Sequence, residues 1–326
     1  MRKKSFIVLV MLFISLILGA CLGEEKSSGG SKQNLILATG TSTGVYYQFG
    51  SILATLWTNE LGQQVTSQGT NGSVENMNLM KNGEATMGFS TVNVMYEAFN
   101  GVGSFDGNPY EDLRILANLY PNVNHFIVST SSGIEKVEEI EGKSFVFGAA
   151  GSATEIESTL VLEAHGVDLD SVNRHYVGFT EAVDLLRNNQ VDGVNIYAGV
   201  PSAATMELIS TVDTKVLNFS EDAIEILTDE SQYPWNFRHV IPAETYDGQD
   251  GDIVTLAQFS GIGIDANVPD DIAYELTKAI WENLEELAQG HAIAEQFDPA
   301  LAVQGTAGIP LHPGAEKYYK EIGVLE

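Results

Sequence analysis

The stretch from residue 35 to residue 50, LILATGTSTGVYYQFG, joins a short apolar run to a glycine-rich turn and to the start of an amphipathic segment. It predicts a strand at Leu35–Thr39 and a helix at Val45–Leu61, with the turn Gly40–Gly44 between them. Gly62 ends the helix. A strand, a turn and a helix form the first half of a βαβ unit, so this stretch favours an α/β fold.

The same alternation continues along the chain. The sequence predicts further strands at 64–68, 86–90, 144–147, 174–177 and 194–197, and further helices at 73–81, 154–165 and 180–188. Strands that alternate with helices in this way imply largely parallel sheets.

Two blocks of the chain resemble each other at a shift of 106 residues. Gly72 then falls on Gly178 and Leu79 on Leu185, and NLMKNGEATMGF lies over DLLRNNQVDGVN. Two similar α/β lobes with a cleft between them form the architecture of periplasmic-type binding proteins, in which hinge closure around a ligand is the functional motion. We therefore expect a two-lobed, periplasmic-binding-protein-like (type II) α/β fold with a hinged cleft between the lobes.

The expected boundaries place the first part of lobe 1 at residues 34–125 and lobe 2 at residues 126–240. Residues 241–326 are expected to return to lobe 1 and to supply the C-terminal helices. Within these parts, Ser220–Gly251 reads as acidic and irregular, Thr255–Ile264 as strand-like, and Asp270–Ala288 as one long helix opened by Pro269.

The first 20 residues have the pattern of a secretory signal peptide. Three basic residues at positions 2–4 precede an apolar run from Phe6 to Leu18, which is too short to span a bilayer. Leu18-Gly19-Ala20-Cys21 resembles a lipobox, and Cys21 is the only cysteine in the chain. Cys21 is therefore the expected lipidation site, an ordinary signal peptide with an incidental cysteine being the other interpretation. Residues 21–33 read as a flexible, glycine- and serine-rich tether, so the protein is expected outside the cytoplasmic membrane, anchored to its outer face.

The chain is strongly acidic, with a formal net charge of −28. Removal of the signal peptide takes away three basic residues and no acidic ones, which leaves 13 basic and 44 acidic residues and a charge near −31. This balance argues against nucleic acid as a partner. It is typical of a well-solvated surface, and it hints at a saline or alkaline habitat.

Three Gly/Ser/Thr-rich turns stand between a predicted strand and a predicted helix, namely Gly40–Gly44, Gly69–Ser73 and Gly148–Thr154. In parallel α/β sheets such turns lie at the carboxyl ends of the strands, where ligands bind. Each offers free backbone N–H groups and the positive end of a helix dipole, which can hold a carboxylate without a cation. Any one turn alone reads equally well as a helix cap; three turns in two matched lobes favour a shared ligand.

Neutral polar and aromatic residues around these turns complete the predicted site, which needs donors for a carboxylate, acceptors for an ammonium and an aromatic wall. The candidate ligand-binding residues are Thr43, Gly44, Tyr46, Tyr47, Gly72, Ser73, Asn76, Ser90, Thr91, Ser152, Thr154, Asn195 and Tyr197. Nucleotide-binding loops are absent, the six histidines show no metal-binding spacing, and no cofactor is expected.

The pentapeptide GTSTG around Ser42 also has the G-x-S-x-G spacing of a serine hydrolase nucleophile elbow, and His312 lies late in the chain, as such a triad requires. However, that elbow normally follows several strands, and here only one strand precedes Ser42 in the mature chain. There is also no HGGG-type oxyanion loop. A secreted α/β serine hydrolase that uses Ser42 is therefore the alternative interpretation, and no catalytic residue is expected under the preferred one.

Four ordered runs resemble the TAXI family of extracytoplasmic solute receptors of TRAP transporters. They are residues 37–50, residues 68–89, NQVDG together with the proline of YAGVP, and PLHPGAEKYYKE near the C-terminus. The resemblance extends from about Leu35 to the end of the chain. It implies two α/β lobes, no catalysis, and delivery of a small solute to a membrane permease driven by an ion gradient.

Characterised members of that family bind glutamate, glutamine or related acids, so the resemblance implies an acidic amino acid or a small carboxylate as ligand. It also implies a TRAP permease as the membrane partner and a receptor that works as a monomer. The family commonly has an aspartate in the segment matching 90–93, where this chain has Asn93, and His312 falls in a family-typical structural turn. A sensor subunit that passes its ligand state to a signalling partner is a third interpretation.

Overall fold

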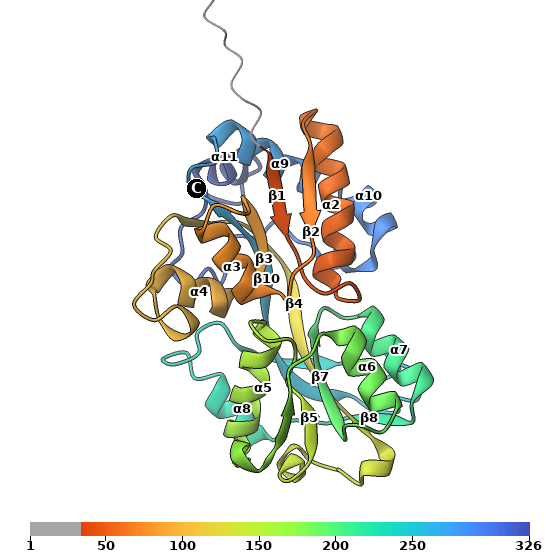
Figure 1. The fold of residues 1–326 in the computed structure, drawn as a ribbon. Helices are drawn as coiled ribbons and strands as arrows, with labels where there is room; N and C mark the ends of the chain where they lie inside the picture. Colours follow the sequence, from red (N-terminus) through yellow and green to blue (C-terminus); the bar gives the residue numbers. More distant parts are fainter. Residues whose placement is uncertain (1–33) are drawn as a thin grey trace, which may run out of the picture. The chain divides into compact units, whose positions relative to one another are not determined.

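The computed structural model describes residues 34–326, which form one compact unit (Figure 1). The expected signal peptide, the lipidation site Cys21 and the tether lie outside these residues. The strands are β1 (Leu35–Ala38), β2 (Val65–Gln68), β3 (Met87–Thr91), β4 (Leu113–Ser129), β5 (Ser144–Val146), β6 (Asn173–His175), β7 (Gly193–Ala198), β8 (Thr214–Val216), β9 (Phe237–Ile241) and β10 (Ile253–Asp265). The helices are α2 (Val45–Leu61), α3 (Ser73–Lys81), α4 (Val92–Asn100), α5 (Ala153–Ala164), α6 (Phe179–Arg187), α7 (Ala203–Thr211), α8 (Glu221–Leu227), α9 (Asp270–Glu282), α10 (Leu284–Gly290) and α11 (Pro313–Glu321).

The strands pair in the order β2-β1-β3-β10-β4-β7-β5-β6. In the first lobe β1 is parallel to β2 and β3, and in the second lobe β5 is parallel to β6 and β7. The α/β expectation with largely parallel sheets is therefore confirmed within each lobe. The exceptions are β4 and β10, which are antiparallel to their neighbours.

Two long strands connect the lobes, as Figure 1 shows. β4 pairs with β10 from Leu113 to Val123 and then with β7 as far as Val128. β10 begins beside β9 and ends beside β3. Because each strand belongs to both lobes, a small change of their twist would tilt one lobe against the other, which is how a two-lobed fold with a hinged cleft works. The lobe boundaries expected near residues 125 and 240 stay predictions.

The two connecting strands approach each other closely at Gly261. A Cβ atom at this position would lie 2.4 Å from the carbonyl oxygen of Ala117, a distance that no side chain tolerates. The pairing register of β10 and β4 shifts between Ser260 and Gly261. Gly261 is therefore required by the backbone geometry of the connection.

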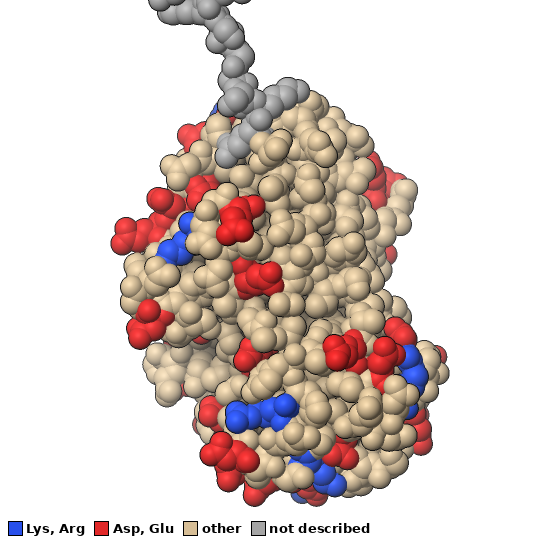
Figure 2. Space-filling model, viewed as in Figure 1, with Lys and Arg blue, Asp and Glu red and all other residues tan. Residues whose placement is uncertain are grey.

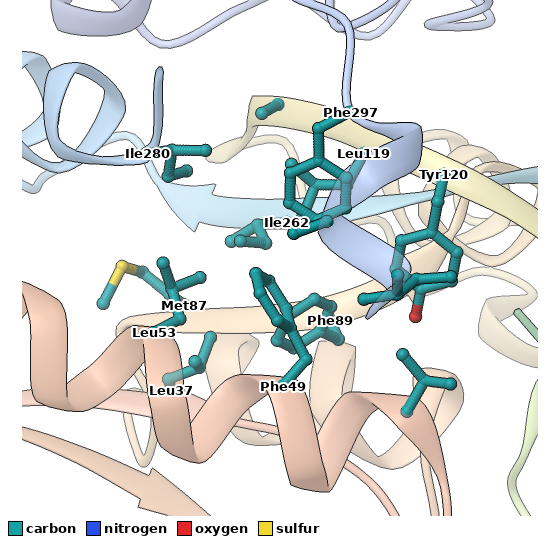
Figure 3. Packing of buried hydrophobic residues seen from close by; sticks show 14 of the residues in the cluster. Leu37, Phe49, Leu53, Met87, Phe89, Leu119, Tyr120, Ile262, Ile280 and Phe297 are labelled. Carbon is teal, nitrogen blue, oxygen red and sulfur yellow. The ribbon is translucent and has the colours of Figure 1, made fainter. Parts of the chain in front are cut away.

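The core of the first lobe lies between α2, the sheet and the C-terminal helices. Phe49, Phe89 and Phe297 pack together in it with Tyr120 beside them (Figure 3). The indole N–H of Trp57 on α2 donates to the carbonyl oxygen of Leu276 on α9 at 2.9 Å. α9 of the C-terminal part therefore packs against α2, and the expected domain division stays a prediction.

The repeat seen in the sequence corresponds to a repeat in the structure. Strand, helix, strand, helix and strand follow one another in both β1-α2-β2-α3-β3 and β5-α5-β6-α6-β7. α3 begins at Ser73 and α6 at Phe179, the same 106 residues apart as the aligned glycines. Gly72 and Gly178 are the N-cap residues of these two helices.

Three segments differ from the sequence-based expectation. The long helix expected at Asp270–Ala288 is interrupted at Asn283, whose backbone leaves the helical region. The side-chain amide of Asn283 donates to the carbonyl oxygen of Ala279. The irregular stretch Ser220–Gly251 contains α8 and β9. β4 was not expected at all, because Pro121 and several asparagines interrupt its apolar pattern. Within residues 34–326 no helix has both the length and the apolar character needed to cross a bilayer.

Candidate ligand-binding site

A cavity lies where the N-terminal ends of four helices meet, α2 and α3 from the first lobe and α5 and α6 from the second. The volume open to the centre of a water-sized sphere is about 50 Å³, so the cavity holds more than one water-sized group. Its lining consists of Gly40, Thr41, Gly44, Val45, Tyr46, Asn71, Gly72, Ser73, Tyr120, Asn122, Ala149, Ser152, Ala153, Thr154, Gly178, Phe179, Tyr197 and Ala198.

Three of the four helix N-termini at this cavity lack a side-chain acceptor for the N–H groups of their first turn. Gly44, Gly72 and Gly178 stand at the N-cap positions of α2, α3 and α6, and none of them has a side chain that could accept a hydrogen bond from the first turn. Ser152 does cap α5, through a bond from the backbone N–H of Glu155. N–H groups in the first turn of a helix seek an external acceptor and carry positive partial charge, so this end of the cavity suits an anion.

Gly72 also has a conformation that favours glycine. Its φ of 118° and ψ of −150° lie in a region that residues with a side chain rarely adopt. This conformation brings the start of α3 up to α5, where the backbone N–H of Glu75 donates to the carbonyl oxygen of Gly151 at 3.2 Å.

The two lobes touch around the cavity. The hydroxyls of Thr43 and Thr180 lie 3.2 Å apart. A Cβ atom on Gly178 would lie 2.9 Å from Cγ2 of Thr41 and 3.6 Å from its Cβ. These contacts, together with the bond from Glu75 to Gly151, join opposite walls, so the structure represents a closed arrangement of the cleft.

Three tyrosines, Tyr46, Tyr120 and Tyr197, line the cavity. Tyr46 Oη lies 2.6 Å from Ser260 Oγ on β10, and burial raises the pKa of Tyr46 to about 12. The hydroxyls of Tyr120 and Tyr197 are buried and have no hydrogen-bond partner among the described residues. Burial raises the pKa of both well above the usual range, so both remain O–H donors. Side chains of Ser260 and Gln258 lie near enough to oppose these two shifts, yet neither reaches hydrogen-bonding geometry.

A second polar cluster, which we call the Glu157 cluster, consists of Glu157 and the three amides that donate to its carboxyl group. Gln258 Nε2 on β10 donates at 2.8 Å, Asn124 Nδ2 on β4 at 3.3 Å and Asn93 Nδ2 on α4 at 3.4 Å. Glu157 itself is on α5, so the cluster joins both lobes and both connecting strands. Burial raises its pKa to about 7, against the lowering effect of the amide donors.

Seven of the thirteen predicted site residues line the cavity: Gly44, Tyr46, Gly72, Ser73, Ser152, Thr154 and Tyr197. The remaining six lie beside it. Thr43 contacts Thr180, Tyr47 is partly exposed over Gly69, Asn76 binds the carbonyl oxygens of Thr39 and Phe89, and Ser90, Thr91 and Asn195 are bonded within the buried framework.

Sequence reasoning missed several lining residues. Tyr120 and Asn122 lie on β4, which was not expected as a strand. Gly178 and Phe179 open α6, and the repeat could have identified them, because Gly178 aligns with the predicted site residue Gly72. A fourth helix N-terminus was therefore implied by the sequence and was not inferred from it.

The residues of the alternative hydrolase interpretation are engaged elsewhere or exposed. His312 is fully buried and caps α11: Nδ1 accepts from the N–H of Gly314 and Nε2 donates to the carbonyl oxygen of Val268. Both ring nitrogens are thus occupied at the start of a helix, which agrees with the expected structural turn. Ser42 lies in the exposed part of its turn.

The cavity lining contains only neutral residues. Within residues 34–326 no group of three or more histidine, cysteine, aspartate or glutamate side chains is arranged to hold a metal ion. Acidic side chains are instead spread over the surface, where they outnumber the basic ones on the face in Figure 2.

Known proteins resemble this chain in sequence pattern and in fold. The model of the NMT1-like family matches residues 37–323. Among solved structures, the periplasmic binding protein BugD has a TM-score of 0.55 at 15% identity, with 89% of this chain and 97% of that chain covered. A protein from Bordetella bronchiseptica has a TM-score of 0.54 at 18% identity over 90% of each chain. The alkanesulfonate-binding protein SsuA from Xanthomonas axonopodis pv. citri, bound to MOPS, has a TM-score of 0.50 at 14% identity, with 86% and 84% covered. At these identities the likeness shows the two-lobed α/β fold, while the match over nearly the whole of the described chain shows that the protein belongs to the NMT1-like family.

Proposed function

We propose that this protein is an extracytoplasmic solute-binding receptor, not an enzyme, which captures a small carboxylate or a glutamate- or glutamine-like amino acid. The observation that carries the proposal is the convergence of four helix N-termini on one cavity, three of them without a side-chain cap. An anionic group placed there accepts hydrogen bonds from the free N–H groups and interacts favourably with the helix dipoles. The relatives in fold include a periplasmic binding protein and an alkanesulfonate-binding protein, which supports the class.

The proposal also includes a membrane partner and a cellular location. The resemblance to the TAXI family suggests that the receptor delivers its ligand to a TRAP-type permease, and the lipobox suggests that Cys21 carries a lipid that holds the chain at the outer face of the membrane. The experiment for the anchor is fractionation of cells that express the full chain or Cys21→Ala. The full chain is expected in the membrane fraction and the variant in the soluble one.

Ligand binding is tested by thermal unfolding of residues 34–326 with a panel of amino acids, monocarboxylates and dicarboxylates. A ligand at 100 times its Kd stabilises the native state by about 2.7 kcal/mol, which raises Tm by roughly 4 °C for a domain of this size. Absence of any shift across the panel would contradict the proposal. An ester-hydrolysis assay of the same protein and of Ser42→Ala distinguishes the hydrolase alternative, which requires a rate that the substitution abolishes.

A further inference from the structure

Besides the helix N-termini, the cavity lining contains residues of two neighbouring strands, Tyr120 on β4 and Tyr197 on β7. Tyr120 is fully buried and Tyr197 nearly so. Each hydroxyl lacks a hydrogen-bond partner among the described residues, although a buried hydroxyl normally has one. Two such tyrosines in the lining of one cavity indicate that the missing partner of their hydroxyls is the ligand.

The neighbouring groups determine what these hydroxyls can recognise. Tyr46 Oη is already bonded to Ser260 Oγ at 2.6 Å, so it competes little for a ligand. Burial keeps the phenols of Tyr120 and Tyr197 protonated, so each has an O–H to donate. The ligand group that meets them is therefore a hydrogen-bond acceptor.

An ammonium group finds no anionic partner at this cavity. None of the 18 lining residues carries a charged side chain. The nearest buried acid identified beside the tyrosines is Glu157, and its carboxyl oxygens already accept from Gln258, Asn124 and Asn93. Glu157 does not line the cavity. The lining offers an ammonium only neutral acceptors, and enclosing a charge without a counter-charge is costly.

We infer that the ligand is a small carboxylate that bears a second, uncharged acceptor and no ammonium, as in a 2-oxo acid, with its carboxylate at the helix N-termini and its second oxygen at Tyr120 and Tyr197. This inference rests on the proposed function and narrows it. The small volume of the cavity, about 50 Å³, agrees with a compact ligand.

Two matched series of compounds test the inference by calorimetric titration of the protein. One consists of 2-oxobutanoate, L-2-aminobutanoate and butanoate, and the other of 2-oxoglutarate, L-glutamate and glutarate. In each series the carbon skeleton is constant and only the group at C2 changes. In the series that binds, we expect the 2-oxo acid to bind about threefold to tenfold more tightly than the acid without a C2 substituent, as one or two hydrogen bonds predict. The amino acid is expected to bind most weakly.

Variants tie this preference to the tyrosines. Tyr197→Phe and Tyr120→Phe are expected to reduce the preference for the 2-oxo acid over the unsubstituted acid to near unity. Tyr176→Phe is the matched control, because Tyr176 is exposed and outside the cavity; it should change nothing.

The outcomes separate this inference from the proposed function. Tighter binding of either amino acid than of its 2-oxo analogue overturns the inference and leaves the carboxylate receptor standing. An undiminished 2-oxo preference in both tyrosine variants also overturns the inference. Absence of binding by all six compounds overturns the proposed function and the inference with it.

Discussion

Two groups of buried polar side chains differ in how their hydrogen bonds are satisfied. In the Glu157 cluster, the carboxyl group accepts from three amides on three different elements. Among the residues that line the cavity, Tyr120 and Tyr197 have hydroxyls without a partner among the described residues. The two groups are neighbours, since the charge of Glu157 contributes to the raised pKa of Tyr197. A satisfied cluster stabilises the arrangement of the elements that it joins, whereas unsatisfied donors cost stability and are available to a ligand.

The largest expected effect is the loss of the Glu157 carboxyl group. Glu157→Ala removes the common acceptor of Asn93, Asn124 and Gln258 and leaves a cavity in a buried site. We expect the free energy of unfolding to fall by about 3–5 kcal/mol, measured by urea denaturation at pH 7. Glu163→Ala on the exposed side of the same helix is the control and should cost less than about 0.5 kcal/mol. A loss as small as the control's would show that the cluster does not stabilise the fold.

The second effect concerns closure of the cleft. Gly178→Ala places a methyl group 2.9 Å from Cγ2 of Thr41 on the opposite lobe. Overpacking of this kind costs about 1–3 kcal/mol, and the cost arises only when the lobes are together. Affinity for the ligand identified in the thermal screen is therefore expected to fall about 5- to 150-fold, while Tm without ligand stays nearly unchanged.

A second substitution at the same contact should restore the affinity that Gly178→Ala loses. Thr41→Ser removes Cγ2 and leaves the nearest remaining side-chain carbon at 3.6 Å, an ordinary van der Waals distance. The double variant Gly178→Ala/Thr41→Ser should regain most of the affinity. Gly251→Ala, at a position with no neighbouring atom within 4 Å, is the neutral control. An affinity loss that Thr41→Ser fails to relieve would place the effect of Gly178→Ala outside the interlobe contact.

The same residues show how much of the fold and of the site can be predicted from the sequence. The βαβ alternation predicted α2 and α3 at their observed bounds, because helix caps and apolar spacing are local signals. The turns at the helix N-termini were readable for the same reason. Tyr120 was not, because its place in the site depends on pairing of β4 with β10 and β7, residues far apart in the chain. Asn76 shows the converse: its position at a helix start suggested a ligand, but its amide is used to join β1 to β3.

The third effect is the pH dependence of stability. The pKa of Glu157 is raised to about 7 in the folded state by burial, so the native state binds a proton more tightly than the unfolded chain does. This acid therefore contributes stability at low pH that is lost as the pH rises through about 7. Between pH 6 and pH 8 the loss is about 1 kcal/mol.

Glu157→Gln isolates this contribution, because the amide resembles the protonated acid and does not titrate. The difference in the free energy of unfolding between Glu157→Gln and the parent protein should move by about 1 kcal/mol in favour of the variant from pH 6 to pH 8. His125, whose pKa burial lowers to about 4, acts in the opposite sense and mainly below pH 6.5. It cancels in this comparison, because the variant and the parent protein share it. A difference that is flat over this range would mean that Glu157 does not titrate near neutral pH.

The smallest expected effect is on the stability of the ligand-free protein when the tyrosine hydroxyls are removed. Because neither Oη has a partner among the described residues, Tyr120→Phe and Tyr197→Phe remove a desolvated polar atom and break no hydrogen bond. The free energy of unfolding should therefore change by less than about 1 kcal/mol, and in the stabilising direction. Urea denaturation without ligand, with Tyr176→Phe as control, measures this. Destabilisation above about 2 kcal/mol would mean that the hydroxyls have a structural partner, and the contrast with the Glu157 cluster would disappear. A stabilised variant with weakened binding would instead show that these residues are kept for the ligand at a cost to the fold.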